Sequence, residues 1–133
     1  FSQLNRLDAY VERRNTLADR YNVMLSDLPV QIPYQHIDIY SSRHLYIIRL
    51  KLDNISISHR EVFEKLRQQG IGVNLHYIPI HTQPYYQKLG FNSGDFPEAE
   101  KYYSEAISLP LYPIMSEKQQ DQVVKSLKGA ILT

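Results

Sequence analysis

Apolar residues recur at steps of three and four positions over the first 28 residues, which is the period of an amphipathic helix. Charged residues such as Arg13 and Asp19 fall on the opposite side. The pattern stops before Pro29 and predicts one long helix over residues 1–28. Its apolar positions are Leu4, Leu7, Val11, Leu17, Ala18, Tyr21, Leu25 and Leu28.

Several later segments have the composition of β-strands. Residues 44–52 form a nearly continuous apolar run, typical of a central strand that is covered on both faces. Tyr46, Ile48 and Leu50 alternate along it and are expected to share one face. The other segments predicted as strands are 35–40, 71–75 and 107–109.

Two capping boxes mark the starts of helices. Ser58 is followed by Glu61, and Ser116 is followed by Gln119, each pair at the spacing in which the two side chains cap the first helical turn. The first box predicts a helix over residues 59–69. The second predicts a C-terminal helix with an apolar side formed by Val123, Val124, Leu127, Ala130 and Ile131.

Two shorter helices are predicted between these. One covers residues 82–89, and the other is capped by Asp95 and packs through an apolar face. That face consists of Ala99, Tyr102, Tyr103 and Ala106. The order of elements predicts an α/β or α+β domain with a three- to four-stranded sheet packed by helices.

The composition of the chain excludes several classes of protein. With 133 residues it fits a single domain, and with no cysteine it has no disulfide, thiolate zinc site or cysteine nucleophile. The absence of cysteine also favours a cytoplasmic location. Fifteen basic and fourteen acidic residues are interspersed, so nucleic acid is not an expected partner. No apolar run approaches the length of a membrane span, so no membrane is expected either.

The segment 74–86 carries the richest chemistry in the chain. It contains two histidines, three tyrosines and two prolines at the end of a predicted strand, which is typical of a loop that faces a ligand. His76 and His81 do not have the spacing of metal ligands, so no metal site is expected. They could also be hydrogen-bonded loop histidines, and the tyrosines could cap the core.

Motifs of an autonomous catalytic centre are not found in the sequence. There is no phosphate-binding glycine loop, nucleophile elbow or paired-carboxylate arrangement. No catalytic residue is therefore assigned, and the chain is expected to assist chemistry located elsewhere. It begins with Phe1 and not methionine, so we expect a piece of a larger protein.

Several blocks of sequence carry a resemblance to a known family. Together they resemble the C-terminal domain of the DegT/DnrJ/EryC1/StrS sugar aminotransferases. Within the family they are most similar to the transaminases of pseudaminic acid biosynthesis, which aminate a UDP-linked 4-keto-6-deoxy-N-acetyl sugar. The blocks occur in the family's order over 45–50, 66–71, 76–81, 94–100 and 107–113.

This resemblance implies a pyridoxal-phosphate enzyme of the type I, aspartate-aminotransferase fold, working as a homodimer with glutamate as amino donor. The cofactor would be held mainly by a larger N-terminal domain, which residues 1–28 would join to a small C-terminal α/β domain over 29–133. None of the lysines matches the one that binds the cofactor, so no cofactor-binding residue is assigned and this piece alone should be inactive.

The resemblance also implies the residues that contact the sugar substrate, since the family's loop is intact here. The assigned residues are Asn74, Leu75, His76, Tyr77 and His81. A competing interpretation is a non-catalytic α+β module that binds a small molecule. Another is a dimerisation domain with residues 4–28 as its partner-facing surface.

Overall fold

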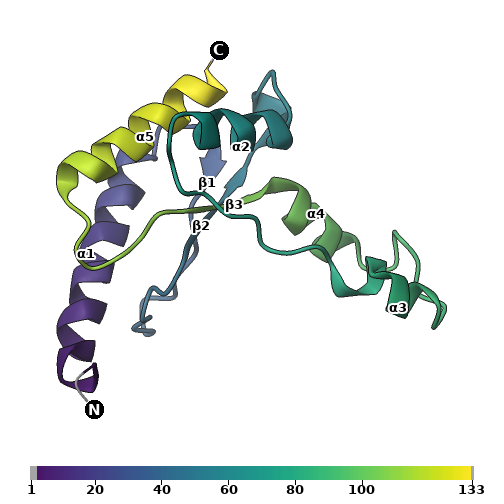
Figure 1. Ribbon diagram of the computed structural model, residues 1–133, viewed down its shortest axis with the longest axis horizontal. Coiled ribbons are helices and arrows are strands. Elements are labelled where there is room, and N and C mark those ends of the chain that lie inside the picture. The colour runs from purple at the N-terminus through teal and green to yellow at the C-terminus, as the bar shows by residue number, and fades with distance from the viewer. Residues whose placement is uncertain (1–2, 133) are drawn as a thin grey trace.

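The computed structural model describes residues 3–132 and contains a three-stranded antiparallel sheet in the order β1-β2-β3. The strands are β1 (Val30–Gln31), β2 (Tyr46–Leu50) and β3 (Ala106–Leu109). In the register, Leu50 pairs with Val30 and Tyr46 pairs with Leu109. The predicted class, a small sheet packed by helices, is confirmed (Figure 1).

Helices and 3₁₀ turns fill most of the remaining chain. They are η1 (Leu4–Arg6), α1 (Leu7–Met24), η2 (Leu52–Asn54), α2 (His59–Gln68), η3 (Ile80–Thr82), α3 (Pro84–Gln87), α4 (Pro97–Glu105) and α5 (Glu117–Ile131). Figure 1 shows α1 and α5 on one side of the sheet, whereas α3 and α4 extend away on the other side.

The alternation of β2 sets the two faces of the sheet. Tyr46, Ile48 and Leu50 are buried and belong to the main hydrophobic core, as predicted. On the opposite face Arg49 forms an ion pair with Glu105, with Nη2 and Oε2 2.7 Å apart, and its guanidinium lies 5.6 Å from the ring centroid of Tyr102. This face is mixed, because Ile47 and Arg49 alternate along it, and it carries α4.

A buried glutamine joins α1 to α5. Nε2 of Gln120 donates to the carbonyl of Leu17 at 2.6 Å, and its Oε1 accepts from Arg20 at 3.1 Å. The hydroxyl of Tyr21 donates to the carbonyl of Pro110 at 3.0 Å. These hydrogen bonds fix the first and last helices against each other and against the chain that leaves β3.

Both predicted capping boxes are confirmed. The hydroxyl of Ser58 accepts from the amide of Glu61, whose carboxylate accepts from the amide of Ser58 at 2.8 Å. Ser116 and Gln119 make the same pair of bonds at the start of α5. The apolar side predicted for the C-terminal helix is buried as expected.

The first helix is shorter than predicted. Residues 1–2 of the predicted helix lie outside the described residues; from residue 3 onward, the α-helix begins at Leu7, after the turn η1, and ends at Met24. Leu4 and Leu7 are exposed, whereas the later part of the predicted stripe, from Leu17 onward, is buried. Residues 25–27 form a turn, so the helix stops before the segment that leads to Pro29.

Two predicted strands are wrong. Residues 35–40 form no strand, and β1 lies earlier because Val30 pairs with Leu50. In residues 71–75 only Asn74 pairs, through an isolated bridge to Ser108. The reason is local: the amide of Ile71 donates to Leu66 at the end of α2, and that of Val73 donates to Ile71, so neither can join a ladder.

The predicted face of α4 is also wrong, as is its cap. No residue of α4 is buried, and Ala106, the last residue of the predicted face, is buried as the first residue of β3. Asp95 does not cap it; its carboxylate accepts from the amide of Asn92 at 2.7 Å. The helix instead starts with Pro97 in its first turn. The helix predicted over 82–89 is confirmed only as α3.

Candidate functional site

The candidate loop starts where the chain touches the edge of the sheet. The amide of Asn74 donates to the carbonyl of Ser108 at 3.2 Å, and the amide of Ser108 donates back at 2.8 Å. This bridge anchors the loop beside β3. Asn74 itself is exposed and Leu75 is half-buried.

His76 is a buried polar residue with an unused nitrogen. Its side chain is 8% exposed, and its Nε2 atom has no hydrogen-bond partner among the described residues. The edge of the Tyr77 ring packs on it, with centroids 4.6 Å apart and an angle of 72° between the planes. Tyr77 is 76% exposed. A buried nitrogen without a partner loses hydrogen-bond energy, which a ligand can restore.

His81, the second histidine of the loop, is held by a carboxylate. Its Nε2 donates to Oε1 of Glu100 at 2.7 Å, and its ring packs against Phe96 at a centroid distance of 4.9 Å. Oε1 of Glu100 also accepts from the amide of Gly94, and Oε2 accepts from the hydroxyl of Ser93. The hydrogen bond from His81, followed by those from Gly94 and Ser93, lowers the pKa of Glu100 below its ordinary value.

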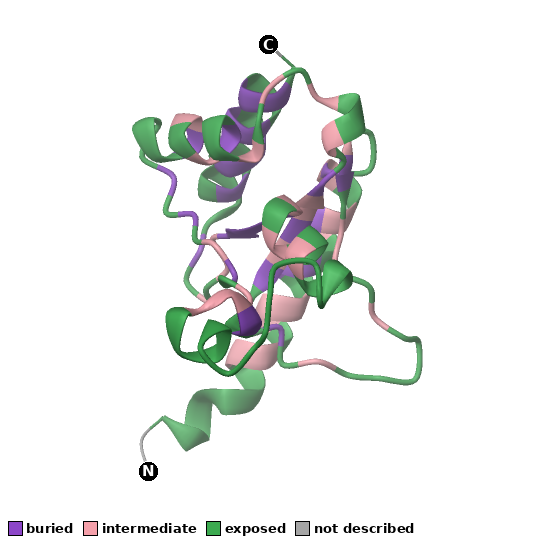
Figure 2. Ribbon diagram, turned by 90° about the vertical axis from the view of Figure 1, so that its right-hand side faces the viewer, coloured by how far each residue is buried: buried purple, intermediate pink, exposed green. Residues whose placement is uncertain are grey.

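Beyond the loop lies the α3–α4 lobe, which we define as residues 77–105. It contains a chain of aromatic contacts around an apolar cavity of about 450 Å³. The lobe faces the viewer in Figure 2 and is mostly exposed. The residues that line the cavity are Ile80, His81, Tyr86, Phe91, Phe96 and Ala99.

The structure therefore separates the two histidines. Nε2 of His76 is buried beside Tyr77 without a partner, whereas His81 is hydrogen-bonded to Glu100 and packs inside the lobe. Contact of either residue with substrate stays a prediction. Sequence reasoning missed Glu100, because no spacing rule links residues 19 positions apart. Its only signal was its place in the 94–100 block.

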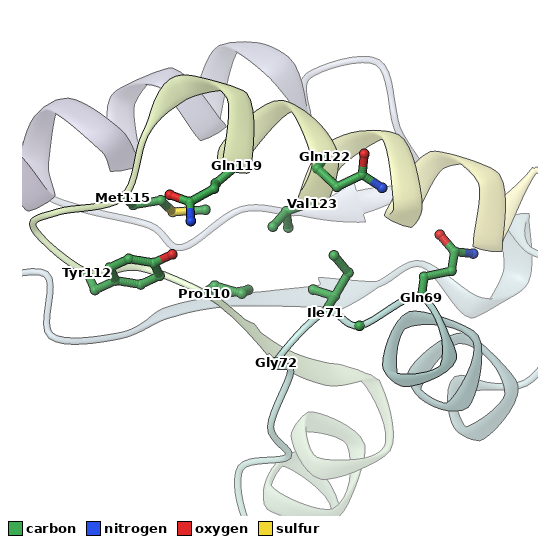
Figure 3. Close-up of a pocket in the computed structure, with 10 residues that line it drawn as sticks. Gln69, Ile71, Gly72, Pro110, Tyr112, Met115, Gln119, Gln122 and Val123 are labelled. Atoms are coloured by element: carbon green, nitrogen blue, oxygen red, sulfur yellow. The ribbon is translucent and has the colours of Figure 1, made fainter.

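A further cavity of about 470 Å³ lies between α5 and the chain that leaves β3 (Figure 3). Its lining is apolar at Met115 and Val123, with amides at Gln119 and Gln122. Both amides are already engaged: Gln119 in the capping box and Gln122 with the hydroxyl of Ser126. Gln69, at the end of α2, and Tyr112 also line it, so the cavity joins apolar walls to several polar side chains.

The lysines do not fit attachment of a cofactor. A Schiff-base lysine needs a desolvated pocket, yet every lysine of the chain is exposed except Lys65, which is half-buried. Within residues 3–132, no three histidine, aspartate or glutamate residues are grouped so that they could hold a metal ion. No helix of the described chain is long and apolar enough to cross a membrane.

Residues 1–128 match the model of the DegT/DnrJ/EryC1/StrS aminotransferase family, so the chain belongs to this family. Among curated proteins it is 36% identical over 132 residues to the spore coat polysaccharide biosynthesis protein SpsC of Bacillus subtilis. That match covers 97% of this chain and 34% of SpsC, so the chain spans about a third of its relative.

Solved structures agree with this assignment. The PLP form of Spr1654 from Streptococcus pneumoniae superimposes with a TM-score of 0.86 at 28% identity, covering 97% of this chain and 33% of that one. PseC from Helicobacter pylori, an aminotransferase involved in pseudoaminic acid biosynthesis, superimposes with a TM-score of 0.88 at 26% identity. It covers 98% of this chain and 35% of PseC.

Proposed function

We propose that this chain is the C-terminal domain of a pyridoxal-phosphate-dependent aminotransferase that moves an amino group from glutamate to a 4-keto-6-deoxy nucleotide sugar. Membership of the aminotransferase family over residues 1–128 supports the reaction class. The likeness to PseC supports a UDP-linked N-acetyl sugar of the pseudaminic acid pathway.

This domain's proposed role is to bind the sugar substrate. The observation that supports this role is the buried Nε2 of His76, which has no partner and lies beside the exposed ring of Tyr77. A neutral imidazole can donate or accept a hydrogen bond to a sugar hydroxyl or a phosphate. A tyrosine ring can pack on the sugar or the base. We assign substrate contact to Asn74, Leu75, His76, Tyr77 and His81.

Pre-formation of the loop would support this contact. Pro79 precedes η3, and its carbonyl accepts from the hydroxyl of Thr82 at 2.8 Å. The bond between His81 and Glu100 fixes the far end of the loop. Less ordering is then needed when the sugar binds, which preserves affinity.

We propose that the cofactor is held mainly by a larger domain outside this chain, and the exposure of the lysines supports this. We propose that residues 1–28 join that larger domain. The exposed Leu4 and Leu7 on the first turns of this segment support such packing. We also propose that the full-length protein is a homodimer and is located in the cytoplasm.

The absorbance spectrum of the full-length protein with pyridoxal phosphate tests the reaction class. A cofactor band that shifts when glutamate is added is expected. Addition of the UDP-linked 4-keto sugar should then restore the original band and yield the amino sugar. A protein that forms no cofactor band would instead be a non-catalytic binding module.

A further inference from the structure

Arg43 is a buried cation without an anionic partner. The residue is 8% exposed, and none of the ion pairs formed within residues 3–132 includes it. Its Nε atom is buried and has no hydrogen-bond partner in the described chain. Burial of an unpaired charge costs free energy, and binding of an anion next to Arg43 would reduce this cost.

A cavity of about 510 Å³ lies beside Arg43, between α1, β1 and the loop that follows β1. No aspartate or glutamate lines it, so the guanidinium is not neutralised there. Gln35 also lines the cavity, and its Oε1 is a second buried atom without a partner. Its Nε2 is fixed by donation to the carbonyl of Ile39 at 2.7 Å. These two residues of the cavity lining therefore have one unused donor, Nε of Arg43, and one unused acceptor, Oε1 of Gln35.

The backbone at Arg43 is strained, with a φ of 46°. The loop is held in place because the amide of Arg43 donates to the hydroxyl of Ser41 at 3.1 Å, and Nδ2 of Asn15 on α1 donates to the carbonyl of Ser41 at 2.9 Å. Strained residues that the surrounding structure holds firmly cluster at ligand sites. Arg43 therefore combines a buried side chain, a guanidinium without an anionic partner and a strained backbone.

We propose that Arg43 and Gln35 form a binding site for the oxyanion of a small metabolite. The guanidinium donates to a carboxylate or phosphate oxygen, and Oε1 of Gln35 accepts from a neighbouring amino or hydroxyl group of the same ligand. The choice of ligand rests on the proposed function, whose two substrates carry these groups. Glutamate has an ammonium beside a carboxylate, and a nucleotide sugar has hydroxyls beside a diphosphate.

Isothermal titration calorimetry on the full-length protein tests the site with glutamate, UDP and pyrophosphate as separate probes. Arg43→Gln should weaken at least one of them by about tenfold to a hundredfold, the range for loss of a charged hydrogen bond. The exposed Arg60, paired with Glu64, provides the matched control, since Arg60→Gln removes the same charge. Loss of glutamate binding identifies the carboxylate as ligand, and loss of UDP and pyrophosphate binding identifies the phosphate.

Unchanged affinity of Arg43→Gln for all three probes overturns the proposal, as does failure of the original protein to bind any of them. Arg43→Gly separates binding from folding, because glycine adopts the positive φ without strain. This variant should keep its melting temperature and still lose binding; retained binding in it overturns the proposal. No turnover is measured, so the result is independent of the cofactor spectrum that tests the proposed function.

Discussion

Nε2 of His81 lies 2.7 Å from Oε1 of Glu100, and this hydrogen bond ties the end of the candidate loop to the first turn of α4. The same carboxylate also accepts hydrogen bonds from the amide of Gly94 and the hydroxyl of Ser93. The Glu100 side chain therefore joins two other segments of the α3–α4 lobe, η3 and residues 93–94, to α4. Its removal should loosen the lobe without unfolding the sheet, which lies in a separate layer.

Glu100→Gln should speed hydrogen exchange at the amide of Gly94, because a neutral amide oxygen is a weaker acceptor than a carboxylate. Exchange at the core amides of β2 should not change. Glu98→Gln is the matched control, since it removes a charge from the same helical turn of α4. Equal exchange at Gly94 in both variants would contradict the role of Glu100.

The same residue predicts a dependence on pH. The pKa of Glu100 is lowered in the folded chain from its ordinary value of 4.5, mainly by the hydrogen bond from His81. The carboxylate therefore stabilises the fold above pH 4.5, and this contribution disappears as pH falls through the lowered pKa. The melting temperatures of the original protein and Glu100→Gln should converge as acid is added. A difference that persists at the lowest pH would contradict this.

If the proposed function holds, His76→Ala in the full-length protein should raise KM for the nucleotide sugar about tenfold while changing kcat less, because the proposed role of the imidazole is to bind the substrate and not to take part in the reaction. Steady-state kinetics against the sugar and against glutamate measure this. KM for glutamate serves as the internal control and should stay the same. An unchanged KM for the sugar would exclude contact by His76.

Local signals in the sequence predicted the parts of the fold that local interactions decide. The capping boxes of Ser58 and Ser116 and the alternation of Tyr46, Ile48 and Leu50 need only neighbouring residues, and all are present. Strand pairing depends on distant partners. The segment 71–75 has the composition of a strand, but the amide of Ile71 is used by the end of α2.

Within the candidate site, whose contact with substrate stays a prediction, the sequence indicated only local features. Composition singled out His76 and Tyr77, whose rings the structure brings together. The bond between His81 and Glu100 and the unpartnered state of Arg43 depend on how distant segments meet, so no pattern in the sequence indicates them. Arg43 in particular stands among polar residues before a strand and looks there like an exposed surface arginine.

The capping box of α5 gives a prediction for stability. Ser116→Ala removes the hydroxyl that accepts from the amide of Gln119 at 3.3 Å, leaving a helical amide without its cap. The free energy of unfolding should fall by about 1 kcal/mol. Urea denaturation measures this loss, with Ser42→Ala as the control because Ser42 is exposed and lies outside any helix. Equal losses in the two variants would show that the box contributes nothing.

Gln120 gives the strongest test of the core, because its amide is fully buried between α1 and α5. Gln120→Ala removes two hydrogen bonds. The carbonyl of Leu17 loses its donor at 2.6 Å, and the guanidinium of Arg20 loses one acceptor. Loss of a partner for a buried polar group should lower the free energy of unfolding by about 1–3 kcal/mol. Lys125→Ala, on the exposed side of the same helix, should change it by less than about 0.5 kcal/mol. If urea denaturation gave the two variants the same stability, the helices would be held by apolar packing alone, and the hydrogen bonds of Gln120 would only offset the cost of burying its amide.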